Sequence, residues 1–222
     1  KVDPGEKIAL VGHTGSGKTT IVNLLMRFYD IDEGEILIDG VNIKEITKES
    51  LRNTISIVLQ DTVLFIDSIA NNIKYGKLDA SFEEMKAAAI LANVNFFVKK
   101  LPDRYDTMLT EGGSNLSQGQ RQLLSISRAV LKDPKILILD DSVSAVDTKT
   151  EKTILENLRT TRAGKTTILI AHRISTIEKM DKILFIDEGK MVAVGTHREL
   201  YETCEDYRKM VELQKLEEEG GQ

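Results

Sequence analysis

The sequence predicts an α/β fold in which helices cover a mostly parallel sheet. Short apolar runs alternate with amphipathic stretches along the chain, which is the pattern of strands that alternate with helices. The runs within 135–139 and 166–170 are continuously apolar, as expected for strands that are buried on both faces. The segment from about 62 to 133 contains no convincing strand pattern, so we expect an all-helical subdomain inserted into the α/β core.

The individual elements follow from these runs and from helical periodicity. Strands are predicted at 7–11, 35–38, 55–59, 135–139, 166–170, 182–186 and 190–194. Helices are predicted at 17–28, 82–92, 117–131, 148–159 and 199–216. The chain, residues 1–222, is then expected to be a single domain of ordinary size.

Composition excludes several classes of protein. A net charge of -5 with no long basic run argues against a nucleic-acid partner, and a single cysteine, Cys204, excludes an internal disulfide framework. The longest apolar runs, such as 136–139 and 183–186, are far shorter than the roughly 20 residues that cross a bilayer. No basic-then-apolar leader opens the chain, and it starts at Lys1 without a Met. We therefore expect a soluble piece of a longer protein, which leaves open that the longer protein is a membrane protein.

A glycine-rich loop follows the first predicted strand and fits the pattern G-x-x-x-x-G-K-T. Its residues, with the threonine that follows, are Gly12, His13, Thr14, Gly15, Ser16, Gly17, Lys18, Thr19 and Thr20. In such a loop the backbone N–H groups turn toward one centre and cradle phosphates, next to the positive end of a helix. The lysine can reach the β- and γ-phosphates, and Thr19 can ligate Mg²⁺. A chance glycine turn is the alternative, but the flanking strand and helix favour a nucleotide site.

Two carboxylates end the strand predicted at 135–139. Asp140 and Asp141 follow four apolar residues, at the carboxyl edge where open α/β sheets bind ligands. Asp140 is expected to hold Mg²⁺ through water, opposite Thr19. A strand that simply ends in solvated aspartates is the alternative.

Residues 115–122 read Asn-Leu-Ser-Gln-Gly-Gln-Arg-Gln and resemble the LSGGQ signature of ATP-binding cassette (ABC) proteins, with Gln118 in place of the first glycine. On its own this stretch is also an ordinary helix start, in which Ser117 caps the helix. The resemblance implies a P-loop NTPase core with a parallel sheet, an inserted helical subdomain and a truncated antiparallel β subdomain. It also implies ATP and Mg²⁺ as cofactors, with Ser117, Gly119 and Gln120 binding ATP on the partner subunit.

Further motifs extend the resemblance through most of the chain. Gln60 resembles the Q-loop glutamine, a Mg²⁺ ligand that reports to the transmembrane partner. Ser144 and Asp147 lie in a segment that resembles the D-loop, which crosses the dimer interface. His172 resembles the switch histidine that contacts the γ-phosphate, although a lone histidine there is often only structural. The resemblance therefore makes Asp141, His172 and Gln60 the catalytic set.

Two further segments, 110–113 and 69–73, resemble those of the exporter branch of the family. The N-terminal strands, the adenine-stacking aromatic and the transmembrane domain of relatives are expected to lie outside this chain. Asp141 stands where hydrolysing relatives carry Glu, and a carboxylate one methylene shorter is retracted by about 1.5 Å. We therefore expect a slow site, like that of the degenerate subunit in heterodimeric exporters.

The resemblance implies one half of a head-to-tail ATP-sandwich dimer that couples ATP binding and hydrolysis to export. Its expected partners are a second nucleotide-binding domain, in a heterodimer, and the coupling helices of a transmembrane domain, at the cytoplasmic face of the cell membrane. One alternative is a regulatory module that binds ATP without hydrolysing it. Another is a soluble ABC protein of DNA repair or translation, although the long coiled coils or tandem cassettes of those relatives are not visible here. The transported substrate is not encoded in this chain.

Overall fold

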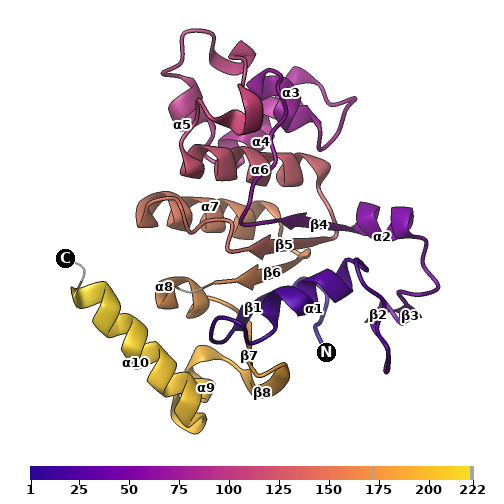
Figure 1. Cartoon of the computed structure of the whole chain (residues 1–222), viewed down its shortest axis with the longest axis vertical. Helices are drawn as coiled ribbons and strands as arrows, with labels where there is room; N and C mark the ends of the chain where they lie inside the picture. The colour runs from indigo at the N-terminus through magenta and orange to yellow at the C-terminus, as the bar shows by residue number, and fades with distance from the viewer. Residues whose placement is uncertain (172, 221–222) are drawn as a thin grey trace. The chain divides into compact units, whose positions relative to one another are not determined.

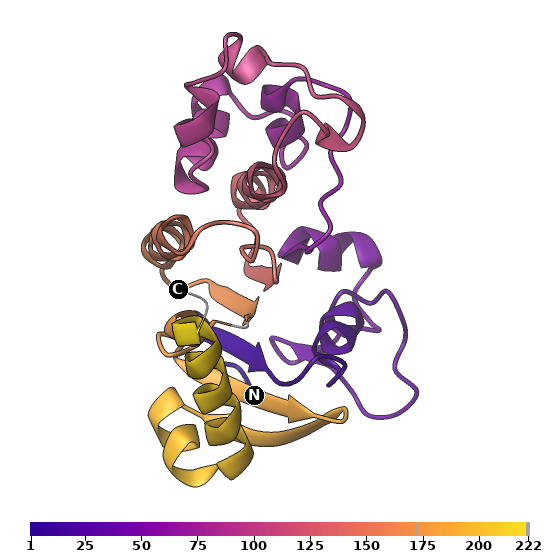
Figure 2. The ribbon, with the colours of Figure 1, turned by 60° about the vertical axis from the view of Figure 1, so that its left-hand side comes forward.

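The computed structural model describes residues 1–171 and 173–220, and side chains as far as Leu216. The chain divides into two compact units, Lys1–Ile55 with Gly164–Gln222, and Ser56–Ala163. Figures 1 and 2 show the strands and helices of both units. Strands alternate with helices along the chain, and the strands at 166–170, 7–11 and 182–187 of the larger sheet in the first unit are parallel, so the predicted α/β class is confirmed.

The first unit is organised around one buried parallel strand. Its sheet runs in the order β6 (Thr166–Ile170), β1 (Lys7–Val11), β7 (Lys182–Asp187) and β8 (Lys190–Gly195). Ala9 of β1 pairs with Leu169 on one side and with Ile183 on the other, both in parallel register. The last four residues of β1 are no more than 2% exposed. Burial on both faces explains why this strand is apolar without alternation.

The remaining elements of the first unit are a small hairpin and several helices. The hairpin joins β2 (Leu37–Ile38) to β3 (Val41–Asn42) in antiparallel register, so the strand predicted at 35–38 is limited to its last two residues. The helices are α1 (Lys18–Leu25), α2 (Lys48–Thr54), α8 (Ile174–Ile177), α9 (His197–Thr203) and α10 (Glu205–Gly220). Side-chain oxygens begin two of them: Thr47 caps α2, and Thr196 forms a capping box with Glu199 at α9.

The prediction of one helix over 199–216 is wrong, because the chain leaves helical geometry at Cys204. That residue has φ -114° and ψ 106°, which separates α9 from α10. The two helices then pack on each other, and the Tyr207 hydroxyl lies 2.8 Å from Nδ1 of His197. Tyr207 is fully buried against the Phe185 ring, and this burial raises the pKa of its phenol. A break that is only one residue long leaves the apolar period almost intact, so the sequence pattern does not reveal it.

The second unit contains a pair of adjacent strands and several helices. β4 (Ile55–Val58), which begins at the last residue of the first unit, lies next to β5 (Ile136–Asp140). Between them the chain forms α3 (Ile69–Lys74), α4 (Phe82–Leu91), α5 (Asn95–Val98), two 3-10 turns (Arg104–Asp106 and Glu111–Gly113) and α6 (Gln118–Lys132). α7 (Thr148–Thr161) follows β5. An isolated antiparallel bridge joins Ser68 to Met108. The boundaries 62–133 of the helical subdomain stay a prediction.

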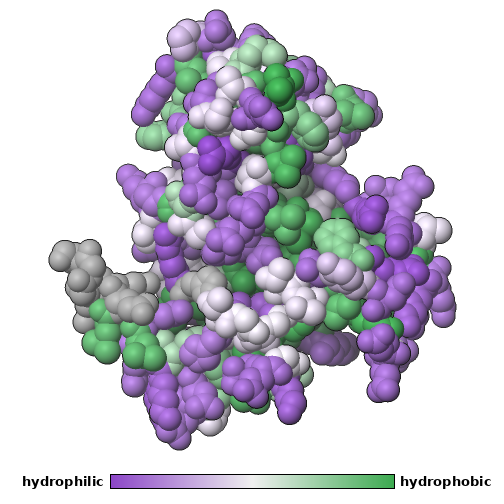
Figure 3. Space-filling model, in the orientation of Figure 1, coloured by the Kyte–Doolittle hydropathy of each residue, from purple (hydrophilic) through white to green (hydrophobic). Residues whose placement is uncertain are grey.

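Helix α6 is the central element of the second unit and packs against α3 and α4 (Figure 1). Its apolar face buries Leu123, Leu124 and Ile126, none more than 6% exposed. The chain after α3 approaches α6 so closely that a Cβ on Gly76 would lie 2.1 Å from the carbonyl oxygen of Arg128. Only glycine fits at this crossing, because real Cβ atoms do not approach a backbone oxygen so closely. Figure 3 shows mostly hydrophilic side chains on the face that it presents.

Candidate functional site

The glycine-rich loop connects β1 to α1 and is fixed by close backbone contacts. Gly12 has φ 156°, and a Cβ there would lie 2.0 Å from the carbonyl oxygen of Ile186 in β7. The loop is also tied to the β7–β8 turn, since the N–H of Gly189 donates to the carbonyl of Ser16 at 2.9 Å. Any residue larger than glycine at position 12 would therefore displace the loop from the sheet.

Lys18 lies inside the curve of this loop and is 6% exposed. Its Nζ donates to the carbonyl oxygens of Gly12 at 2.7 Å and His13 at 2.8 Å, and to Oγ of Ser16 at 3.4 Å. These bonds hold the ammonium where an anion entering the loop would meet it. Thr19, at the first turn of α1, is exposed. The described loop thus offers a buried cation, an exposed hydroxyl and the N-terminal end of an eight-residue helix to a phosphate group.

The paired carboxylates end β5 in the second unit. Asp140 is the last residue of the strand and is 8% exposed, and Asp141 follows with φ 47°. This left-handed conformation is strained for most residues but is tolerated by aspartate. The carbonyl oxygen of Asp141 accepts hydrogen bonds from Ser144, from N at 3.3 Å and from Oγ at 2.8 Å. Asp141 therefore begins a tight turn, which sets the direction in which its side chain leaves the strand.

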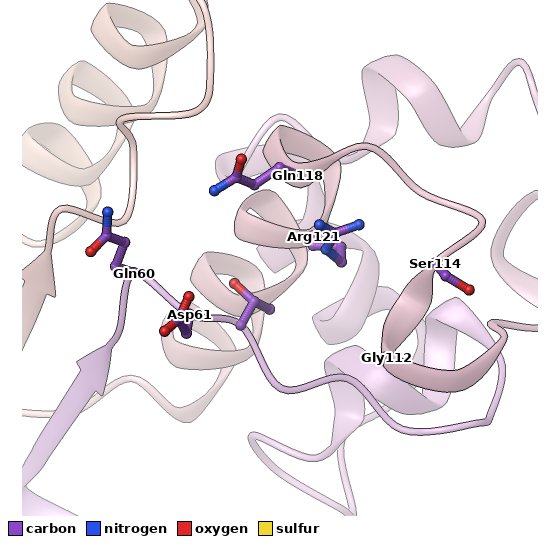
Figure 4. Close-up of a pocket in the computed structure, with 7 residues that line it drawn as sticks. Gln60, Asp61, Gly112, Ser114, Gln118 and Arg121 are labelled. Carbon is purple, nitrogen blue, oxygen red and sulfur yellow. The ribbon is translucent and has the colours of Figure 1, made fainter.

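Gln60 follows β4 and lines a cavity of about 350 Å³ that lies within the second unit. The complete lining consists of Gln60, Asp61, Thr62, Gly112, Ser114, Gln118 and Arg121. Figure 4 shows Gln60 and Asp61 on one side of the cavity and Gln118 and Arg121, from the first turns of α6, on another. Sequence reasoning identified Gln60, and treated Gln118 only as a departure from the signature. Nothing in the local sequence indicates that these segments meet, because they are more than 50 residues apart.

The signature residues form the N-terminus of α6. Ser117 is the N-cap, and its Oγ accepts from the N–H of Gln120 at 3.2 Å. The Gln120 side chain accepts in return from the N–H of Ser117 at 2.9 Å, which completes a capping box. Both predicted ATP-binding side chains are thus used to start the helix in this structure. The first turn remains a helix N-terminus, with the positive end that attracts anions.

The D-loop residues have local structural roles as well. Asp147 is the N-cap of α7, where its Oδ1 accepts from the N–H of Thr150 at 3.0 Å. Hydrogen bonds from the Thr150 side chain and backbone lower the pKa of Asp147 below its ordinary value. His172, predicted as a catalytic residue, lies outside the described residues.

The structure thus places the predicted residues in two groups. The first unit holds the whole phosphate loop with Lys18 and Thr19, and the second holds Gln60, the signature and Asp140 with Asp141. Among the described residues, no cluster of three or more His, Cys, Asp or Glu side chains is arranged to bind a metal ion. In the described part of the chain, no helix combines the length and the apolar character that a membrane span requires.

Comparison with known families and proteins gives a consistent result. Residues 1–144 match the family model described as ABC transporter. An ATP-dependent lipid A-core flippase of Hahella chejuensis (strain KCTC 2396) is 51% identical over 214 residues, which is 96% of this chain and 37% of the flippase. The uncharacterized ABC transporter ATP-binding protein YfiC of Bacillus subtilis (strain 168) is 50% identical over 213 residues, which is 96% of this chain and 35% of that protein.

Among solved structures, a bacterial Atm1-family ABC exporter with ATP bound superposes on this chain with a TM-score of 0.93 and 45% sequence identity. The match covers 95% of this chain and 37% of the exporter chain. The chain therefore spans little more than a third of the length of these relatives, 35% to 37%.

Proposed function

Since the chain belongs to the ABC transporter family and is one of its ABC-type ATPase domains, we propose that it works as one half of a head-to-tail dimer. In this dimer it binds Mg-ATP and couples ATP binding and hydrolysis to export across a membrane. The observation that carries the proposal is the loop around Lys18, whose ammonium is buried and held by loop carbonyls at the start of a helix.

The residues of this chain fit Mg-ATP by the chemistry of their donor groups. When bound, Mg-ATP supplies the γ-phosphoryl group and the charge of the metal. Lys18 binds phosphate oxygens through charge-assisted hydrogen bonds, and the exposed hydroxyl of Thr19 is a ligand of the kind that Mg²⁺ prefers. Asp140, the last residue of β5, and Gln60, two residues after β4, are the further proposed oxygen ligands of the metal. Asp141 orients and polarises the attacking water.

We propose that ATP hydrolysis at this chain's own nucleotide site is slow and that its dimer partner is a different subunit. Asp141 has a carboxylate that is one methylene shorter than that of Glu. The left-handed backbone conformation of Asp141 also fixes the direction of its Cα–Cβ bond. Only rotation about the χ angles can then bring the shorter side chain closer to the attacking water. A heterodimer in which the partner completes a faster site is consistent with this arrangement.

The transmembrane domain of the transporter is the second proposed partner, which puts the chain at the cytoplasmic face of the cell membrane. Apolar side chains that follow Gln60 are unusually exposed: Val63 is 67% exposed and Ile66 is 69% exposed. Next to them lies the cavity lined by Gln60 and Arg121. A surface with exposed apolar side chains beside a polar cavity can bind the coupling helices of that domain.

Calorimetry with Mg-ATP tests this proposal on two variants of the chain. Lys18→Ala removes the cation and should weaken binding severely, whereas Ser117→Arg should leave this chain's own affinity nearly unchanged because Ser117 acts on the partner's nucleotide. Ser117→Arg also removes a helix cap, at a cost of about 1 kcal/mol, so thermal unfolding must confirm that both variants are folded. In the assembled transporter Ser117→Arg should abolish turnover. Unchanged affinity in Lys18→Ala would exclude the loop as the nucleotide site.

A regulatory module that binds ATP without hydrolysis is the second candidate, and Asp141 is the observation that favours it. Single-turnover hydrolysis at this chain's own loop separates the two candidates: a rate above that of Lys18→Ala supports the ATPase.

A further inference from the structure

One face of α6 holds the segment that follows β5, residues 141–147, which we call the D-loop segment. The N–H of Ala145 donates to Oε1 of Gln122 at 3.2 Å. One turn earlier on the helix, a Cβ on Gly119 would lie 2.8 Å from the carbonyl oxygen of the same Ala145 and 3.3 Å from Cγ1 of Val146. Positions 119 and 122 are three apart and share one helix face. Ala145 therefore contacts α6 on two consecutive turns: its carbonyl oxygen lies against Gly119, and its N–H bonds to Gln122.

The burial of Gln122 indicates that this contact is more than packing. The side chain is 0% exposed, and within the described part of the chain its Nε2 has no hydrogen-bond partner. A buried amide donor without a partner destabilises a fold, whereas a leucine of similar volume would carry no such penalty. Among the described residues, the hydrogen bond that the Gln122 side chain does make is the one to the D-loop segment.

A short series of hydrogen bonds connects this contact to the carboxylate at the end of β5. Gln122 fixes Ala145, the preceding residue Ser144 donates to the carbonyl oxygen of Asp141 at 2.8 Å, and Asp141 has the strained φ of 47°. The cap residue Ser117 lies at the same end of α6 as Gln122, five residues before it. The first turn of α6 and the backbone of Asp141 are thus joined through three residues.

We propose that Gln122 is a positioning residue that fixes Asp141 to the first turn of α6, so that the signature and the carboxylate change position together. The inference rests on the proposed function, in which the signature contacts the partner's ATP while Asp141 acts on this chain's own ATP. Gln122 then links the two nucleotide sites of the dimer without touching either nucleotide.

The test combines Gln122→Leu, which removes the acceptor, with Gln122→Glu, which keeps an oxygen at the same place. In the full-length transporter that carries Asp141→Glu, where the longer carboxylate acts as an effective base, Gln122→Leu should lower kcat by up to about tenfold with an unchanged KM for ATP, and Gln122→Glu should stay within about twofold of the same background. In the 222-residue chain, the amide of Ala145 should exchange with solvent faster in Gln122→Leu only. Thermal unfolding checks that the leucine variant is folded.

Ser144→Ala removes the Oγ bond to the carbonyl oxygen of Asp141, while the longer bond from the backbone N–H at 3.3 Å remains. Ser144 is exposed, so the variant tests the same link without disturbing the core. If the bonds act in series, Gln122→Leu with Ser144→Ala should lower kcat no further than the more severe single variant. If the two residues had independent structural roles, the effects of the two substitutions on kcat would instead multiply. Multiplying effects, or an unchanged kcat in Gln122→Leu, would overturn the inference. Absence of Lys18-dependent hydrolysis in wild type would instead refute the proposed function, and amide exchange at Ala145 would still test the contact.

Discussion

Replacing Asp141 by glutamate perturbs rate and stability in opposite directions. The added methylene extends the carboxylate by about 1.5 Å, the length of one C–C bond. The backbone at this position has φ 47°, in the left-handed region that aspartate tolerates and glutamate disfavours. Because a left-handed residue costs about 1–2 kcal/mol, the glutamate variant should lose about 1 kcal/mol of stability. For a chain of this size such a loss lowers Tm by about 2–4 °C.

The rate should rise despite this loss. A well-placed general base contributes about 10²- to 10⁴-fold, so Asp141→Glu should raise single-turnover hydrolysis at this chain's own site by up to that factor. Asp141→Asn keeps the backbone preference and removes the base, so it should change the slow wild-type rate little. Neither variant should alter Mg-ATP affinity much, because the proposed metal ligand Asp140 is unchanged.

The assay must use the full-length transporter with a competent partner signature, since poor assembly would otherwise resemble poor chemistry. Two results would refute the reasoning. A fast wild-type rate that collapses in Asp141→Asn would make Asp141 an effective base as it stands. A glutamate variant with a lower Tm but no gain in rate would place the limitation elsewhere in the site.

Two further predictions concern stability. Gly76→Ala should destabilise the chain by at least about 2 kcal/mol in urea unfolding, because its Cβ would lie 2.1 Å from the carbonyl of Arg128. Gly34→Ala, with φ 79° but no atom within 4 Å, should cost only about 1 kcal/mol, and equal losses would contradict the steric argument. The hydrogen bond from Lys77 lowers the pKa of Glu84 from 4.5 to about 2, so its contribution to stability is present above pH 4.5 and is lost as the pH falls through about 2. The Tm difference between wild type and Glu84→Gln should therefore shrink over that range, and a difference that does not depend on pH would disprove this assignment.

The strands were the most predictable part of the fold. Those predicted at 7–11 and 166–170 are β1 and β6 with the same bounds, and the strand predicted at 135–139 begins and ends one residue before β5. A strand buried on both faces is apolar along most of its length, so its pattern depends little on its neighbours. Short helices were missed, including α2, α3 and α8, because one or two turns contain too few positions to show a helical period.

For the candidate site, local sequence was sufficient wherever the chemistry lies in one contiguous segment. The phosphate loop is such a segment, since its glycines, Lys18 and Thr19 stand within eight residues and the flanking strand and helix are encoded beside them. The capping role of Asp147 is also local, because it joins an aspartate to an N–H three residues away. The capping role of Ser117 was predicted and is confirmed, whereas that of Asp147 was not stated, although the helix predicted at 148–159 begins directly after it.

The sequence by itself determined the α/β class, the phosphate loop, the carboxylates that end β5 and the family to which the chain is similar. Tertiary structure alone decided which distant segments meet: Gln60 with Gln118 and Arg121 around one cavity, and Gln122 with Ala145 on one face of α6. The reason is physical. Periodicity and motifs record how each residue relates to its near neighbours along the chain, whereas a hydrogen bond between residues 23 positions apart depends on how a helix packs against the loop after a strand.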